Sequence, residues 1–292
     1  GLALSNNRKI AARFGHALET WEQVLSRELG ALSAREIIPN VYVAGSPLAT
    51  ASKVFKGRRD LFLALERELA TAAETRPTLL LFGARRCGKT SAIKQMPVRL
   101  GPEVIPVEVD LQSAATAEDA SGLLFVLADH IKHNALTHRR IQLPALMRYD
   151  LRADPYVVFG DWLQRVEQAV GARWILLNLD EYERLAEMME AGRIDARVFD
   201  FLRGIIQHHP RVTVLLSGSH TLDDVGAFFK TPKTPNVGAQ LIAPLQTPLQ
   251  TPLQTPLQTP LSDYLINVRV LKIGNLKEDE ARELIVQPIE DF

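Results

Sequence analysis

Residues 83–90 are GARRCGKT, which matches the pattern G-x-x-x-x-G-K-[ST] at every fixed position. Glycine lets the backbone curl closely around a phosphate group, so that consecutive N–H groups can point toward it. A helix that begins near Lys89 would add the positive end of its dipole to the same place. The pattern therefore predicts a loop that binds the phosphates of a nucleotide.

The sequence around this loop supports the prediction. The apolar stretch TLLLF at residues 78–82 is typical of a buried strand, and a helical stretch follows at residues 89–100. We expect Lys89 to reach the β- and γ-phosphates and to act in catalysis, and the Thr90 hydroxyl to bind Mg²⁺. The residues expected to bind the nucleotide are Gly83, Ala84, Arg85, Arg86, Cys87, Gly88, Lys89, Thr90 and Ser91.

A second apolar strand, WILLNLDE at residues 174–181, ends in two adjacent carboxylates. We expect Asp180 to hold Mg²⁺ through water and Glu181 to act as the general base for an attacking water. The alternative is that both are solvated acids at a strand end. Asp110 also ends a strand but has no second carboxylate after it, so we expect at most a structural or water-positioning role there.

A further strand at residues 212–217 leads into Gly218-Ser219-His220. Either Ser217 or Ser219 could sense the γ-phosphate, or the segment could instead cap the next helix. His130 and His133 are three residues apart on a predicted helix, but no third ligand is suitably spaced, so a metal site there is disfavoured.

Short apolar strands alternate with helical stretches along the chain, which predicts a three-layer α/β fold with a parallel sheet. The expected strands are 78–82, 104–110, 174–180, 212–217 and 266–273. The expected helices are 58–74, 89–100, 117–136, 155–170, 195–208, 221–229 and 277–286.

Two segments lie outside this pattern. Residues 7–30 carry an apolar stripe at spacings of four and three, which predicts an amphipathic helix that packs on a domain or, alternatively, binds a partner as a coiled coil. Residues 230–262 are rich in Thr and Pro, with repeated Leu-Gln-Thr-Pro units that block helix and central strand. We therefore divide the chain into an N-terminal helix and linker, 1–35, and a nucleotide-binding domain, 36–292, that contains this insertion.

The composition limits the partners. Lys+Arg and Asp+Glu are both 34, so the formal net charge is zero, and this balance does not support binding to nucleic acid. No apolar run is long enough to span a membrane. A single cysteine, Cys87, is compatible with a reducing cytoplasm. Because the chain opens with Gly1 and its first methionine is Met96, we expect it to be part of a larger protein.

The motifs together resemble P-loop ATPases of the AAA+/STAND type, including bacterial AAA-like, origin-recognition-like and archaeal-type ATPase domains. The resemblance spans roughly residues 39–288. It implies a sheet order of 5-1-4-3-2, and an adenine placed near Tyr42–Val43 and Phe55–Arg58. It rests on residues 40–47, 55–58, 85–86, 180–181, 215–219, 271–276 and 280–285. We expect the lid domain of such ATPases to be missing from residues 1–292, so no lid arginine is assigned, and Arg203 and Arg211 are only guesses at a trans-acting arginine.

This resemblance implies an ATPase with ATP and Mg²⁺ as cofactors. Our first hypothesis is a nucleotide-driven regulatory switch in a multidomain protein, which acts through self-association or other domains of the same polypeptide. The alternatives are a nucleic-acid-associated loader or remodeller, a small-molecule P-loop kinase, and a module that binds nucleotide without turnover.

Overall fold

The computed structural model describes residues 2–33, 42, 45–71, 77–114, 117–221 and 268–286. The chain divides into two compact units, Gly1–Val43 and Ala44–Phe292. None of the described helices is both long enough and apolar enough to cross a membrane.

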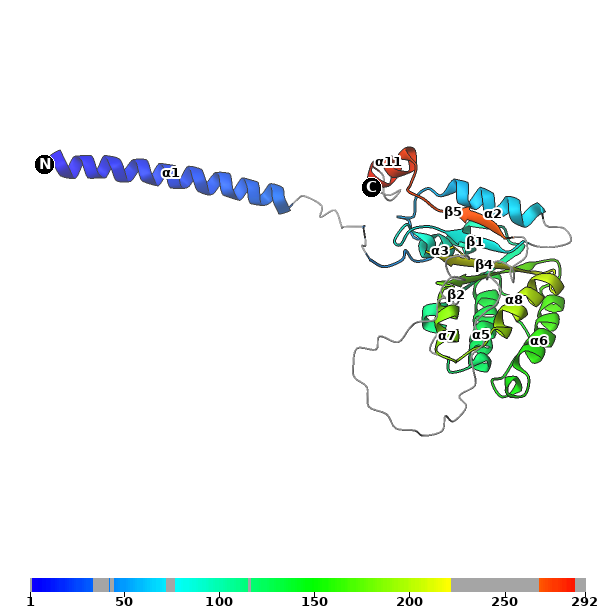
Figure 1. The fold of residues 1–292 in the computed structure, drawn as a ribbon. Helices are drawn as coiled ribbons and strands as arrows, with labels where there is room; N and C mark the ends of the chain where they lie inside the picture. Colours follow the sequence, from blue (N-terminus) through cyan, green and yellow to red (C-terminus); the bar gives the residue numbers. More distant parts are fainter. Residues whose placement is uncertain are drawn as a thin grey trace, which may run out of the picture. The chain divides into compact units, whose positions relative to one another are not determined.

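The first unit contains one long helix in its described part, α1 at Leu2–Ser33 (Figure 1). Spacings of four and three residues place the predicted apolar side chains on one face of this helix. Taken by itself, the unit exposes these side chains, which are Ile10, Phe14, Leu18, Trp21, Leu25 and Leu29. The N-terminal helix predicted from this stripe is confirmed.

The second unit contains a five-stranded sheet whose order is β2-β3-β4-β1-β5. All of its neighbouring strands run parallel. Counted from the other edge, this is the predicted order 5-1-4-3-2. The strands are β1 at Leu79–Phe82, β2 at Val104–Asp110, β3 at Trp174–Asp180, β4 at Val212–Gly218 and β5 at Arg269–Lys272.

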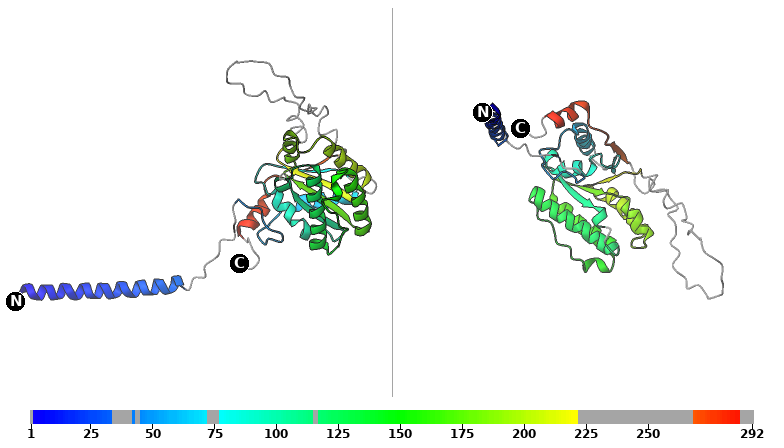
Figure 2. Two further views of the ribbon diagram at one scale, coloured as in Figure 1. Left: turned by 90° about the horizontal axis from the view of Figure 1, so that it is seen from below. Right: turned by 90° about the vertical axis from the view of Figure 1, so that its left-hand side faces the viewer.

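Helices cover both faces of the sheet (Figures 1 and 2). One face carries α2 at Arg59–Thr71 and α3 at Lys89–Arg99, while α11 at Glu278–Val286 contacts the start of α2 through the pair of Glu283 with Arg59. The other face carries α5 at Ala120–Arg139, α6 at Pro155–Val170, α7 at Arg184–Glu190 and α8 at Arg197–His208. Two short elements, α4 at Leu111–Ala114 and η1 at Asp150–Arg152, complete the described part. The predicted three-layer α/β architecture is confirmed.

The strand β1 shows why its sequence is apolar at every position. Leu79 and Leu81 are buried in the core that lies under α2 and α3. Leu80, between them, is buried in the opposite core with side chains of α5 and α6. Successive side chains of a strand point to opposite faces, so a parallel strand covered on both sides needs apolar residues throughout. The phosphate-loop motif thus follows a strand that is fixed from both faces.

Some boundaries differ from the expectations. The helix expected at 117–136 begins at Ala120, because the Asp119 carboxylate accepts a hydrogen bond from the Gly122 amide at 2.7 Å and caps it there. The helix α7 is an addition that the sequence did not predict, since its seven residues are too few to show a helical period. Apart from Thr221, the predicted helix at 221–229 and the insertion at 230–262 lie outside the described residues.

Candidate nucleotide-binding and catalytic site

The motif at residues 83–90 forms the turn between β1 and the start of α3. Gly88 has φ 94°, a left-handed conformation that glycine adopts at little cost. Gly83 meets a different requirement. A Cβ at this position would lie 2.5 Å from the Ile273 carbonyl oxygen and 2.6 Å from its Cγ2, so the loop passes closely over the residue that follows β5.

Lys89 is almost fully buried, with 7% of its surface exposed. Its Nζ donates hydrogen bonds to the Gly83 carbonyl at 2.8 Å and to the Ala84 carbonyl at 3.0 Å. These bonds hold the ammonium against the start of its own loop. An ammonium carries three donors, so the same group can also donate to a phosphate oxygen.

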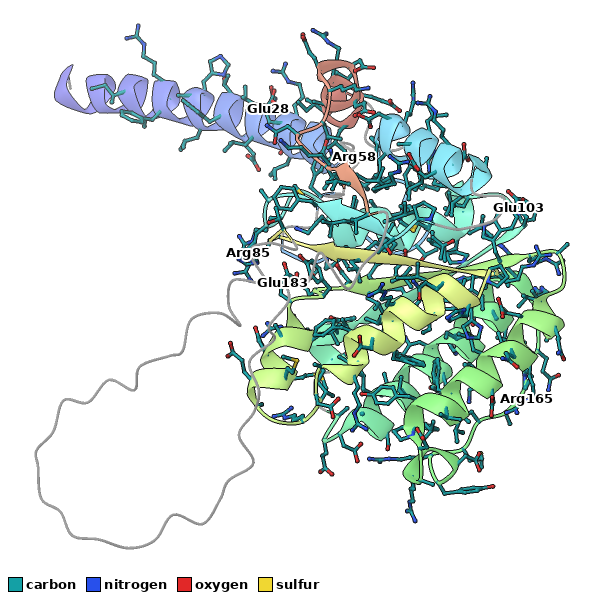
Figure 3. The ribbon with its side chains drawn as sticks, turned by 45° about the vertical axis from the view of Figure 1, so that its right-hand side comes forward. Glu28, Arg58, Arg85, Glu103, Arg165 and Glu183 are labelled. Atoms are coloured by element: carbon teal, nitrogen blue, oxygen red, sulfur yellow. The ribbon has the colours of Figure 1, made fainter. Side chains whose placement is uncertain are left out.

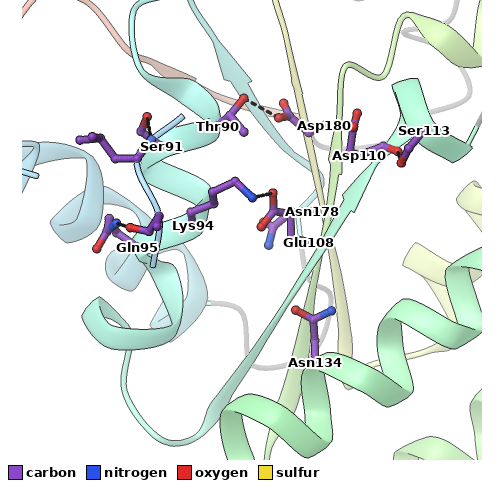
Figure 4. Close-up of polar contacts among 12 residues, drawn as sticks. Thr90, Ser91, Lys94, Gln95, Glu108, Asp110, Ser113, Asn134, Asn178 and Asp180 are labelled. Carbon is purple, nitrogen blue, oxygen red and sulfur yellow. Dashed lines mark hydrogen bonds and ion pairs between the residues drawn. The ribbon is translucent and has the colours of Figure 1, made fainter. Parts of the chain in front are cut away.

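Asp180, at the carboxyl end of β3, is bonded to both α3 and β4, and Figure 4 shows its bond to Thr90 of α3. Its Oδ2 accepts a hydrogen bond from the Thr90 hydroxyl of α3 at 2.7 Å, and its Oδ1 accepts one from the Ser217 hydroxyl of β4. Asp180 is only 3% exposed, and it lies beside Ser217 in the sheet register. A carboxylate beside a hydroxyl provides the oxygen ligands that Mg²⁺ prefers, so these residues fit the predicted metal.

Glu181 follows directly and leaves the strand geometry. Its φ is 54°, a left-handed value that is uncommon for residues other than glycine, and its amide donates to the Asp180 Oδ1 at 3.1 Å. Partial burial raises the pKa of the Glu181 carboxyl, and the nearby charges of Glu183 and Asp180 raise it further, while Lys89 and Arg85 act in the opposite direction. Figure 3 labels Arg85 and Glu183, two of the charged residues that affect this pKa. A raised pKa makes a carboxylate a better proton acceptor.

The two serines considered as γ-phosphate sensors lie in different surroundings. Ser217 is fully buried and its hydroxyl is bonded to Asp180. Ser219 is half-buried, and its backbone amide donates to the Glu183 Oε1 at 2.6 Å. Only the Ser217 side chain is therefore tied to the predicted metal ligand. The helix predicted at 221–229, which this segment could cap, lies outside the described residues apart from Thr221.

Other polar residues from the sequence have structural partners. Asp110 lies beside Asp180 in the register, but its Oδ1 accepts a hydrogen bond from the Gln112 amide at 2.8 Å. The His130 Nδ1 lies 2.7 Å from the Glu108 carbonyl oxygen. In the described part of the chain, no group of three or more His, Cys, Asp or Glu residues could hold a metal ion. Arg211 precedes β4 and so lies at the opposite end of the strands from the site.

Sequence reasoning did not find the role of Arg58, although it quoted the segment that contains it. The Arg58 Nη2 donates to the Cys87 carbonyl at 2.7 Å, and its Nη1 donates to the Gly274 carbonyl at 2.6 Å. This guanidinium therefore joins the phosphate loop to the chain that leaves β5. A cavity of about 310 Å³ adjoins the same segment and is lined in part by Phe55, Lys56 and Gly57. The adenine was expected near these residues.

A parallel sheet of this order, with the glycine-rich loop between its β1 strand and a helix, defines the fold of a P-loop nucleotide-binding protein. Among solved structures, this chain resembles the Walker-type ATPase Paby2304 of Pyrococcus abyssi, with 16% identity and a TM-score of 0.52. That match covers 82% of this chain and 59% of the other.

Cdc6p from Pyrobaculum aerophilum also matches, with 10% identity and a TM-score of 0.41, over 85% of this chain and 52% of that one. The chain thus spans between half and three-fifths of each of these proteins. The sequence matches no protein-family model and no curated protein. The comparison with Paby2304 agrees with the P-loop ATPase fold expected from the sequence.

Proposed function

We propose that this chain binds ATP with Mg²⁺ and hydrolyses it, as an AAA+/STAND-type module that acts as a nucleotide-driven regulatory switch in a larger multidomain protein. The observation that carries the proposal is the position of Asp180. Its carboxylate accepts hydrogen bonds from Thr90 on the helix after the phosphate loop and from Ser217 on β4, and Glu181 follows it directly.

In this proposal the loop residues 83–91 hold the triphosphate with their amides and with the Lys89 ammonium. Thr90 and Asp180 hold Mg²⁺, which neutralises charge on the phosphates when bound. Glu181 accepts the proton of the attacking water, and its raised pKa suits that role. Ser217 supports Asp180, and we propose Ser219 as the side chain that faces the γ-phosphate.

The proposed regulatory role is based on contacts that connect the phosphate loop to α11, the last helix of the described residues. Arg58 ties the phosphate loop to Gly274, and α11 follows a few residues later. Movement of the loop on nucleotide exchange would therefore reach α11, and through it other domains or a second copy of the protein. The net charge of zero favours such partners over nucleic acid.

We further propose that residues 36–292 form the ATPase domain, with residues 1–35 as a helix and linker and residues 230–262 as an insertion. The single cysteine is compatible with a reducing compartment, and we propose the cytoplasm.

The direct test is inorganic phosphate release from ATP, measured with Mg²⁺ and with a chelator. Glu181→Gln should leave ATP binding intact and slow turnover by about 100-fold or more, the scale of a lost general base. Glu187→Gln is the matched control, because Glu187 is exposed on α7 and pairs with Arg184 outside the site. Normal turnover in Glu181→Gln would show that the base is misassigned, and phosphate transfer to a small molecule without phosphate release would favour a kinase.

A further inference from the structure

Glu183, two residues after the proposed general base Glu181, connects two loops at the carboxyl ends of β3 and β4. Its Oε1 accepts hydrogen bonds from the Ser219 amide at 2.6 Å and from the His220 amide at 3.0 Å. The His220 Nδ1 lies 3.2 Å from the same oxygen. A carboxylate that accepts two backbone N–H groups forms charge-assisted bonds, which are stronger than those between neutral groups.

Two contacts of Tyr182 strengthen this connection. The Tyr182 amide donates to the Ser217 carbonyl at 3.2 Å, and its hydroxyl donates to the His220 carbonyl at 2.9 Å. The segment 181–183 is thus fixed to the segment 217–220 by both backbone and side-chain bonds. Because Glu181 lies at one end of the first segment, these bonds also restrict the direction of its side chain.

Gly218 provides the space that Glu183 needs. A Cβ on Gly218 would lie 2.6 Å from the Glu183 Cδ, and even closer to both carboxylate oxygens. The backbone of Gly218 is not in the left-handed region, so its conformation alone would allow an alanine. Only the Glu183 side chain opposes it. Glycine at position 218 is therefore explained by the carboxylate that packs against it.

The Glu183 carboxylate is also buried at a cost. Its side chain is 13% exposed, and its Oε2 has no hydrogen-bond partner among the described residues. Burial of an unsatisfied acceptor opposes folding, and Glu183 is near enough to Glu181 to raise the pKa of that carboxyl. If the Glu183 carboxylate served stability alone, a neutral side chain at this position would stabilise the fold more.

We propose that Glu183 is a positioning residue: by holding the Ser219–His220 backbone against the acidic loop, it directs Glu181 and Ser219 toward the same γ-phosphate. This inference rests on the proposed ATPase function and adds to it the contact that aligns the base with the sensor. Glu183 does not itself touch the reacting atoms in this account, and it acts through the two segments that it joins.

The test compares Glu183→Ala, Glu183→Gln and Gly218→Ala in the full chain, with Glu187→Ala on α7 as the control. We expect Glu183→Ala and Gly218→Ala each to lower kcat at least tenfold, with the Kd for Mg-ATP changed less than threefold. Glu183→Gln keeps an oxygen that can accept the two amides, so it should retain kcat within about threefold. The double variant Glu183→Ala/Gly218→Ala should have the same kcat as the slower of the two single variants, because each substitution removes the same contact.

Hydrogen exchange provides a readout that does not depend on turnover. The Ser219 and His220 amides should exchange at least tenfold faster in Glu183→Ala than in the wild type, since each loses a bond to a charged acceptor. If Glu183→Ala fails to fold, Glu183→Gln and Gly218→Ala decide the question. Unchanged kcat in Gly218→Ala, or a Glu183→Gln variant with kcat lowered tenfold or more, would overturn the proposal.

The two proposals can fail separately. A wild-type protein without ATP turnover would reject the proposed function, and the exchange rates would still test the positioning contact. Unchanged exchange at Ser219 and His220 in Glu183→Ala or in Gly218→Ala would overturn the inference whatever the turnover.

Discussion

Several residues of the site have left-handed backbone conformations, which are unfavourable for residues other than glycine. Arg58, Arg86 and Glu181 have φ values of 61°, 64° and 54°, and each lies in or beside the phosphate loop or the acidic pair. Such conformations cost free energy and persist where the surrounding bonds fix them, which is common at functional sites. The glycines of the motif could be predicted from the sequence. The turned backbone of Glu181 could not, because it results from contacts with β4.

Gly83 gives a test at this scale. Gly83→Ala should destabilise the protein by about 1–3 kcal/mol, because its Cβ would meet the Ile273 carbonyl and the backbone must shift. The same shift should weaken Mg-ATP binding. The free energy of unfolding can be measured with denaturant, and the affinity by titration.

Gly160 is the matched control, because it lies within α6 and a Cβ there would meet nothing within 4 Å. Gly160→Ala should stabilise the protein by about 0.5–1 kcal/mol through helix propensity. Equal effects of the two substitutions would contradict the close approach described for Gly83.

At the scale of elements, the sequence predicted best where a strand is buried on both faces. The strands 104–110 and 174–180 have the predicted bounds, because each is a largely apolar stretch that ends at an aspartate, Asp110 or Asp180. The helix α7 was missed since seven residues do not establish a period. The start of α5 was placed three residues early, because the pattern alone did not identify the cap at Asp119.

Glu280 gives a test of how one element is attached. Its carboxylate is buried in α11, accepts the Lys277 amide at 3.2 Å and the Arg59 amide at 3.4 Å, and packs against Gly57. The first bond is half of a capping box. Glu280→Ala should therefore destabilise the protein by about 1–3 kcal/mol, since it leaves two amides without this acceptor.

Glu280→Gln keeps an acceptor oxygen and should cost less than Glu280→Ala. Thermal unfolding and hydrogen exchange of residues 278–286 would measure both effects. If Glu280→Gln lowers the stability as much as Glu280→Ala, the hydrogen bonds to the Lys277 and Arg59 amides do not hold α11 in place.

At the scale of the whole molecule, periodicity predicted a parallel α/β sheet but not the order of its strands. The order came from the resemblance to AAA+/STAND ATPases, because strand order depends on contacts between distant segments. The contacts of Arg58 and Glu183 escaped prediction for the same reason. Arg58 and Gly274 are separated by 216 positions, and no local pattern encodes a bond over that distance.

The division into two units gives a test at this scale. The buried members of both core clusters run from Phe55 to Ile273 and so lie within the second unit. A chain that begins at Ala44 should therefore keep its melting temperature within a few degrees. Loss of cooperative unfolding in that shorter chain would show that residues 1–43 are part of the folding unit.

The central claim is that the loop at residues 83–90 binds the phosphates of ATP, and calorimetric titration with Mg-ATP tests it most directly. The folded wild type should bind, and Lys89→Ala should lose about 100-fold or more in affinity, as expected for removal of charge-assisted hydrogen bonds. Lys94→Ala removes another cation from the same helix, one that pairs with Glu108. This variant should bind Mg-ATP like the wild type. A folded wild-type protein without affinity for Mg-ATP, or equal affinity in Lys89→Ala, would contradict the account.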